Sequence, residues 1–124
     1  MSATITTFGI LHDPEPLAVD PIRVDLTDAL RNPAHDPAMI DMTGLDERVR
    51  KHVLNTPGAY TILGDAVAQI EVALSEASAV DVLVYCRGGR HRSVAIGEEI
   101  AAYCTRQRIA HRIAHRDVTR QVVR

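Results

Sequence analysis

A short apolar run rich in valine, at residues 80–85, is followed at once by Gly88 and Gly89 and then by a helical pattern. The run has the composition of a strand that is buried on both faces. Residues 93–108 then place isoleucines four positions apart, as a helix would, and residues 109–116 return to an alternating, strand-like pattern. Strand, glycine loop, helix and strand in this order predict a βαβ unit, which requires parallel strands joined by a right-handed crossover.

The first half of the chain predicts two more strands and two helices. Residues 4–10 are rich in β-branched side chains and residues 22–26 read IRVDL, so both are expected to be short strands. Residues 32–43 contain two prolines and predict a long ordered loop. Apolar side chains recur at helical spacing in residues 43–54 and again in residues 58–77. The sequence therefore predicts an α/β fold with a mainly parallel sheet flanked by helices.

Length and composition favour one domain for these elements. The chain has 46% hydrophobic and 24% charged residues, as globular proteins do, so residues 1–124 are expected to form a single domain. No apolar run is long enough to span a membrane and no secretory leader is recognisable, which favours a cytoplasmic protein without membrane partners. Two cysteines are too few for a disulfide framework, and Cys104 is expected to be a small buried apolar residue.

The loop between the predicted strand and helix has the ingredients of an anion-binding loop. In open α/β sheets, ligands bind beyond the carboxyl ends of the strands, where this loop is expected to lie. Its glycines allow close approach, the helix N-terminus offers free N–H groups, and Arg92 can hold two phosphate oxygens. A solvated basic turn is the alternative, although cations are normally disfavoured at a helix N-terminus. The predicted anion-binding residues are Cys86, Arg87, Gly88, Gly89, Arg90, His91, Arg92 and Ser93.

The same loop fits Cys-x-x-Gly-x-x-Arg-Ser and so resembles the signature loop of cysteine-dependent phosphatases. That resemblance implies a reaction in which the Cys86 thiolate attacks phosphorus, Arg92 and the loop N–H groups hold the oxygens, and an aspartic acid protonates the leaving group. Asp13 and Asp36 are the candidate acids, although spacing singles out neither. Tyr85 precedes the cysteine, where many of these enzymes have a histidine.

Five ordered motifs resemble the C-terminal domain of the RapZ family of RNase adaptor proteins. The loop itself is similar to that family's Cys-x-Gly-Gly-x-His-Arg-Ser-Val segment. Because the agreement extends over nearly the whole chain, this family is preferred to the phosphatases. The other four motifs are FGILH at Phe8–His12, LRNP at Leu30–Pro33, MTGLDERV at Met42–Val49 and HRDV at His115–Val118.

The resemblance implies a regulatory binding domain that senses glucosamine-6-phosphate and binds small RNA on behalf of an RNase. The loop would hold the phosphate, and further motif positions are expected to line the same cleft. Each of these also has a structural explanation: Thr43 could cap a helix, Asn32 could satisfy a loop backbone, and His12 could be a surface histidine. The implied cleft residues outside the loop are Thr43, Gly44, Asn32 and His12.

The chain departs from the family pattern in three places. Full-length members carry a nucleotide-binding domain with a Walker-type loop ahead of this one, and no such loop occurs here, so neither ATP hydrolysis nor a cofactor is expected. Thr27 and Asp28 stand where the family has an arginine, and a carboxylate there suits a sugar hydroxyl or amine better than a phosphate. Arg87 takes the place of a threonine that is common in the family loop.

Charge is sorted along the chain, although the net charge is only −2. Residues 1–86 carry 5 basic and 13 acidic side chains, whereas residues 87–124 carry 9 basic and 3 acidic ones. Such a split indicates either an anionic partner for the basic part or an uneven surface.

Arginines recur at every fourth position of the C-terminal segment. On a strand, Arg108, Arg112 and Arg116 would share one face, and on a helix they would form a drifting stripe; both suit phosphate backbones. A solvated face is the alternative, and the absence of nearby aromatic residues argues against base stacking. His111 and His115 lack a third ligand, so no metal site is expected. Small RNA, an RNase and a second copy of the chain are the candidate macromolecular partners. The predicted RNA-binding residues are Arg108, Arg112, Arg116 and Arg120, with Arg124 in the same rhythm.

Overall fold

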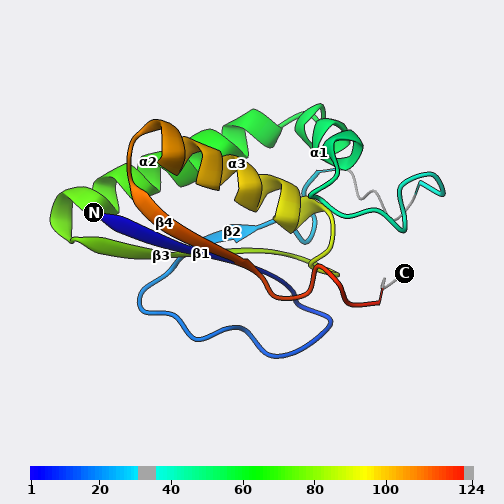
Figure 1. The fold of residues 1–124 in the computed structure, drawn as a ribbon, viewed down its shortest axis with the longest axis horizontal. Coiled ribbons are helices and arrows are strands. Elements are labelled where there is room, and N and C mark those ends of the chain that lie inside the picture. The colour runs from blue at the N-terminus through cyan, green and yellow to red at the C-terminus, as the bar shows by residue number, and fades with distance from the viewer. Residues whose placement is uncertain (31–35, 122–124) are drawn as a thin grey trace.

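The computed structural model describes residues 1–30 and 36–121, which form four strands and three helices (Figure 1). In chain order the elements are β1 Ser2–Gly9, β2 Ile22–Asp25, α1 Glu47–Leu54, α2 Ala59–Glu76, β3 Ala79–Cys86, α3 Arg92–Arg106 and β4 Ala110–His115. The strands form one sheet in the order β2-β3-β1-β4, and every neighbouring pair is parallel. The predicted α/β fold with a parallel sheet flanked by helices is therefore confirmed.

The order of the strands explains why the helices of the described residues lie on one face of the sheet. The chain crosses the sheet in one direction from β2 to β3 and on to β4, but in the opposite direction from β1 to β2. Right-handed crossovers in opposite directions pass over opposite faces. Accordingly, α1, α2 and α3 cover one face and the segment 10–21 crosses the other (Figure 1).

The core lies between the sheet and the helices. Val82 and Val84 of β3 belong to this core, and Leu83, which points to the other face, is also only 1% exposed. β3 is thus buried on both faces over these residues, as its composition predicts. Cys104 is buried in the core, as expected. None of the helices in the described part of the chain is long and apolar enough to cross a membrane. Other fully buried core side chains are Ile5, Leu26, Ile70, Ile96 and Ile100.

The first helix starts later than the sequence predicts. A helix from Thr43 is expected, but α1 begins four residues further on, because the Asp46 carboxylate caps it by accepting the Arg48 N–H at 2.8 Å. Leu45, predicted on the buried face, precedes the helix and is 50% exposed. The other predicted helices and strands are found within two residues of their expected ends. The buried side chains of α1 are Val49 and Val53.

Helix α3 packs closely against β1 at Gly97. A Cβ atom at this position would lie 2.6 Å from the Cγ2 methyl of Thr7, whose side chain is fully buried. A β-branched side chain in a strand has little rotational freedom, so Thr7 cannot easily move aside. Packing therefore favours glycine at this position of α3.

Gly97→Ala should lower the free energy of unfolding by up to about 2 kcal/mol, because the strain of overpacking exceeds the gain in helix propensity. Gly64 in α2 is the matched control, since a Cβ atom there would meet nothing within 4 Å. Gly64→Ala should raise the free energy of unfolding by about 0.5–1 kcal/mol. Urea denaturation measures both changes, and equal stabilisation by the two substitutions would show that the contact between α3 and β1 tolerates a side chain.

Candidate anion-binding site

Residues 86–93, here called the glycine loop, follow the body of β3 at the carboxyl edge of the sheet and lie beside the end of β1. In the parallel register, Gly9 is the partner of Cys86. The pairing continues past the strand, because the Ile10 N–H donates to the Cys86 carbonyl at 3.0 Å. The end of β1 therefore forms one wall of the glycine loop.

Three glycines bring the backbones of these two segments into direct contact. A Cβ atom on Gly9 would lie 2.3 Å from the carbonyl carbon of Gly88, and one on Gly89 would lie 2.3 Å from the Gly9 nitrogen. Gly89 also has a φ of 73°, a left-handed conformation that glycine adopts without strain. The turn of the glycine loop thus rests on the end of β1, and a side chain at Gly9 or Gly89 would push the two apart.

Several backbone N–H groups of the turn have no partner within residues 1–30 and 36–121. The Gly89 N–H donates to the Cys86 sulfur at 3.3 Å, and the Cys86 thiol donates to the Ser93 hydroxyl at 3.3 Å. Helix α3 begins within the loop, so its first N–H groups have no helical carbonyl to bond. Among the described residues, no hydrogen-bond acceptor is found for the N–H groups of Gly88, Arg90, His91, Arg92 and Ser93. Successive free N–H groups at a helix N-terminus suit an anion.

Arg92 is buried and joins the glycine loop to the end of β2. It is 4% exposed, and its Nη1 donates to the carbonyl of Leu26 at 2.9 Å and to that of Ala29 at 3.2 Å. Its Nε has no hydrogen-bond partner among the described residues. Burial is the main cause that lowers the pKa of this guanidinium. The sequence predicts that Arg92 binds two phosphate oxygens at once. This stays a prediction, and Nη1 already donates to carbonyl groups within the chain.

Arg90 and His91 bond to neighbouring segments of backbone. Both reach carbonyl groups in the segment before α1, and Arg90 also reaches carbonyl groups after β4. Burial first, and then the neighbouring charge of Arg90, lower the pKa of His91, so its imidazole is neutral at pH 7. These basic side chains therefore hold adjacent segments against the glycine loop. The acceptors are the carbonyl oxygens of Ile40, Asp41, Met42, Val118 and Arg120.

Thr43 and Gly44, two of the residues predicted to line the cleft, border the glycine loop. The Gly44 N–H donates to the Arg90 carbonyl at 2.8 Å, and a Cβ atom on Gly44 would lie 2.4 Å from the His91 carbonyl oxygen. The Thr43 hydroxyl accepts the Leu45 N–H at 3.2 Å instead of capping α1. The structure thus places this motif beside the loop, and its part in a ligand cleft stays a prediction.

His12 lies just past the end of β1. Its backbone N–H donates to the Gly9 carbonyl at 3.3 Å, and its Nε2 is buried without a hydrogen-bond partner among the described residues. An unpaired buried ring nitrogen is unusual for a structural or surface histidine, because buried polar atoms are normally bonded. Asn32 lies outside the described residues, so its predicted place in the cleft stays a prediction.

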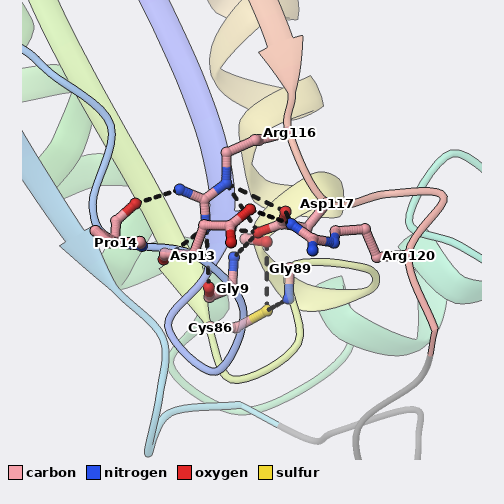
Figure 2. A network of polar contacts seen from close by, with 9 residues as sticks. Gly9, Asp13, Pro14, Cys86, Gly89, Arg116, Asp117 and Arg120 are labelled. Carbon is pink, nitrogen blue, oxygen red and sulfur yellow. Dashed lines mark hydrogen bonds and ion pairs between the residues drawn. The ribbon is translucent and has the colours of Figure 1, made fainter.

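A buried carboxylate that the sequence pattern does not single out, Asp117, lies beside Gly9 at the end of β1 (Figure 2). Its Oδ2 accepts the Gly9 N–H at 2.8 Å and a hydrogen bond from Arg116 Nη2 at 2.9 Å, and Arg120 lies 3.4 Å from its Oδ1. Arg116 also donates to the Gly9 carbonyl at 3.3 Å. Both polar backbone groups of Gly9 are therefore held by the segment after β4. The HRDV motif contains two of these residues, but only the pairing of β4 with β1 brings them to Gly9.

Both carboxylates suggested as phosphatase acids have partners elsewhere in the chain. Asp13 forms an ion pair with Arg120, and Asp36 accepts the Ala38 N–H within its own turn at 2.9 Å. Cys86, the corresponding nucleophile, is 2% exposed. A phosphatase reaction would need one of these carboxyl groups to be released and protonated beside the substrate.

The arginines of the C-terminal segment fall into two groups. Arg108 and Arg112 are exposed and make no ion pair among the described residues. Arg116 and Arg120 bind Asp117 within the chain. The sequence allows either a strand or a helix here, and residues 110–115 form a strand. Arg108 precedes that strand, so it does not share a strand face with Arg112 as predicted.

His111 and His115 have separate partners. The His115 ring bonds the Thr7 hydroxyl at 2.8 Å and the Glu98 carboxylate at 2.9 Å, whereas His111 Nδ1 lies 3.0 Å from the Ile109 carbonyl. In the part of the chain that the structure describes, no group of three or more histidine, cysteine or carboxylate side chains is placed to hold a metal ion.

The fold and the loop define a small α/β domain whose parallel sheet carries a glycine loop at its carboxyl edge. In such folds this edge is where ligands bind. A family model described as the RapZ C-terminal domain matches residues 1–119. The chain therefore belongs to the RapZ C-terminal domain family, as its five motifs predict.

Curated relatives are longer proteins that share this domain. A nucleotide-binding protein of Streptomyces coelicolor is 35% identical over 127 residues, covering 98% of this chain and 41% of that relative. A nucleotide-binding protein of Thermus thermophilus is 42% identical over 96 residues, covering 74% of this chain and 35% of the relative. A nucleotide-binding protein of Corynebacterium jeikeium is 35% identical over 123 residues, covering 94% of this chain and 40% of that relative. The chain thus spans less than half the length of these relatives.

The ionisation of Asp117 links the free energy of unfolding to pH. Burial alone would raise the pKa of Asp117, but hydrogen bonds from Arg116 and Gly9, with the charges of Arg116 and His12, hold it below its usual value. A carboxyl group with a lowered pKa in the folded state stabilises the fold above its unfolded pKa of about 4. This contribution is lost as the pH falls through the folded value.

Asp117→Asn should therefore lower the free energy of unfolding at pH 7, and the difference from the wild type should shrink as the pH falls below about 4. Urea denaturation over this range measures the difference. The matched control is Asp81→Asn, because the Asp81 carboxylate also accepts a backbone N–H, from Val19 at 2.9 Å, but at an exposed site without an arginine partner. A wild-type advantage that stays constant down to about pH 3 would show that the charge of Asp117 contributes nothing.

Proposed function

We propose that the chain is a regulatory binding domain that holds a phosphorylated small molecule, of the amino-sugar phosphate class, at the glycine loop. The observation that carries this proposal is the set of N–H groups at the start of α3, on Gly88 and on Arg90 to Ser93, for which no acceptor is found within residues 1–30 and 36–121. Backbone N–H groups at a helix N-terminus bind phosphate oxygens without needing a free cationic side chain. The resemblance to the RapZ domain makes glucosamine-6-phosphate the first candidate ligand.

The surroundings of the loop suit the rest of such a ligand. The Thr43 hydroxyl and the His12 ring nitrogen, which has no partner in the part of the chain that the structure describes, are the polar groups we expect to contact the ligand beside the phosphate. Arg87 and Asp28 form an exposed ion pair at 3.2 Å beside the loop. Asp28 could exchange this partner for an amine or hydroxyl of the sugar, and Arg87 could then turn to the phosphate.

The names of the curated relatives suggest a second kind of phosphorylated ligand. Those whole proteins are named as nucleotide-binding, and this chain matches less than half of each. No Walker-type loop occurs in its 124 residues. The glycine loop is then the candidate place for a nucleotide phosphate, so nucleotides belong among the compounds to be tested.

Isothermal titration calorimetry with glucosamine-6-phosphate, unphosphorylated glucosamine and a nucleoside monophosphate tests the proposal. The wild type should bind the first and not the second. Gly89→Ala should weaken binding by about tenfold or more, because its Cβ atom would force the loop off Gly9 and misplace the N–H groups. Gly58→Ala is the matched control, because Gly58 also has a positive φ, of 91°, but open space around its Cα. It should leave affinity unchanged.

Released phosphate is measured in the same samples. Release that the Cys86→Ser variant abolishes would make the chain a cysteine phosphatase instead of a binding domain. If the wild type bound none of the phosphorylated compounds, the proposal would be wrong and the loop would be a structural turn.

A second proposal is electrostatic binding of RNA by the C-terminal segment. The observation in its favour is that Arg108 and Arg112 are exposed and lack ion-pair partners among the described residues. Their guanidinium groups are therefore free to contact phosphates, whereas Arg116 and Arg120 are bound to Asp117. An RNase partner and self-association stay predictions.

The double variant Arg108→Ala, Arg112→Ala should bind RNA more weakly, and the slope of log affinity against log salt should fall by roughly 1.5–2 units for two lost phosphate contacts. Filter binding at several salt concentrations measures this slope. Arg48→Ala, Lys51→Ala removes two positive charges from α1 and serves as the control. Equal losses in the two double variants would mean that net charge alone attracts RNA, and the proposal for the C-terminal segment would fail.

A further inference from the structure

Gly9 lies between the segment after β4, which contributes Arg116 and Asp117, and the glycine loop. Its N–H donates to the Asp117 carboxylate at 2.8 Å, and its carbonyl accepts a hydrogen bond from Arg116 at 3.3 Å. On its other side Gly9 touches the Gly88–Gly89 turn. The contact leaves no room for a Cβ atom on Gly9 or on Gly89. Figure 2 shows Asp117, Gly9 and Gly89 close together. A displacement of Gly9 would therefore move the turn.

Asp117 is suited to this place because its charge is balanced within the chain. Its side chain is fully buried, where an unpaired carboxylate would be strongly unfavourable. Arg116 donates from both Nε and Nη2, and Arg120 adds a third guanidinium contact. With two guanidinium groups bound to it, Asp117 adds little net negative potential at the neighbouring anion site.

The same segment meets the glycine loop at a second point. Arg90 Nη1 donates to the carbonyl of Arg120 at 3.2 Å and lies 3.5 Å from that of Val118. Residues 117–120 therefore hold the loop both through Gly9 and through the Arg90 side chain. Two separate contacts restrict the loop more than either would alone.

We propose that Asp117 is a positioning residue for the glycine loop: by holding Gly9 it sets where the Gly88–Gly89 turn lies, and so the affinity for phosphate. The inference rests on the proposed function. A ligand held by backbone N–H groups depends on how well the backbone is fixed before binding, because ordering it afterwards reduces the affinity. Asp117 acts through Gly9 and does not touch the ligand.

Calorimetry with glucosamine-6-phosphate and with inorganic phosphate tests this role in Asp117→Ala and Asp117→Asn. The alanine variant removes the acceptor of the Gly9 N–H and should bind about tenfold more weakly or worse. The asparagine variant keeps an oxygen acceptor but loses the charge that Arg116 and Arg120 bind, so it should recover part of the loss and still bind more weakly than the wild type. Asp81→Ala is the matched control and should bind like the wild type, because Asp81 accepts its N–H from Val19 in the segment that crosses the other face of the sheet.

Circular dichroism and urea denaturation of each variant establish that the protein is folded at the temperature of the titration. A purely structural role would lower the free energy of unfolding and leave the affinity of the folded protein unchanged. Wild-type affinity in folded Asp117→Ala would thus overturn the inference, and so would an asparagine variant that binds no better than alanine. If Asp117→Ala does not fold, Asp117→Asn is compared with the wild type instead. The inference then expects the asparagine variant to bind the ligand more weakly than the wild type, and equal affinity would overturn it. No binding by the wild type would instead refute the proposed function itself.

Discussion

The contact between the end of β1 and the glycine loop is the constraint on which the candidate site depends. Neighbouring parallel strands hold Gly9 opposite Cys86, and the turn that follows must then fold back over Gly9. The turn can do so only if neither segment carries a side chain where they touch. Both positions, Gly9 and Gly89, are accordingly glycines. The turn directs the chain into α3, and the N–H groups that follow find no partner in the part of the chain that the structure describes. The site therefore follows from how two strands end.

The basic side chains of the loop resolve an apparent conflict at the start of α3. Cations are disfavoured at a helix N-terminus, yet Arg90 and Arg92 lie there. Each donates to carbonyl oxygens of other segments: Arg92 to the chain after β2, and Arg90 to the chain before α1 and after β4. Arginine suits this task because its donors form a rigid planar fork. A carbonyl oxygen does not neutralise a guanidinium, so the positive charge remains in place for an anion.

The parts of the structure that were predictable from sequence depend on local pattern. The valine-rich run, the glycine pair and the helical spacing after it were enough to predict the βαβ unit and the position of the glycine loop. The start of α1 was not predictable in the same way, because Thr43 and Asp46 are both good helix caps, and the choice depends on Gly44 packing against the loop. The bond between Gly9 and Asp117 joins residues 108 positions apart and depends on β4 lying beside β1. No short-range pattern contains that information.

The sorting of charge along the chain acquires a different meaning once the strands are paired. Acidic residues of the first half meet basic residues of the second half at the carboxyl edge, as Asp13 does with Arg120 and Asp28 with Arg87. Exposed pairs of this kind stabilise a fold only slightly, so their main effect is on where uncompensated charge remains. Part of the basic excess is neutralised there. The rest is concentrated where guanidinium groups meet carbonyl oxygens or solvent, that is, around the glycine loop and along β4. For the anionic ligand that we propose, positive charge thus lies at the same place as the N–H groups that have no partner among the described residues.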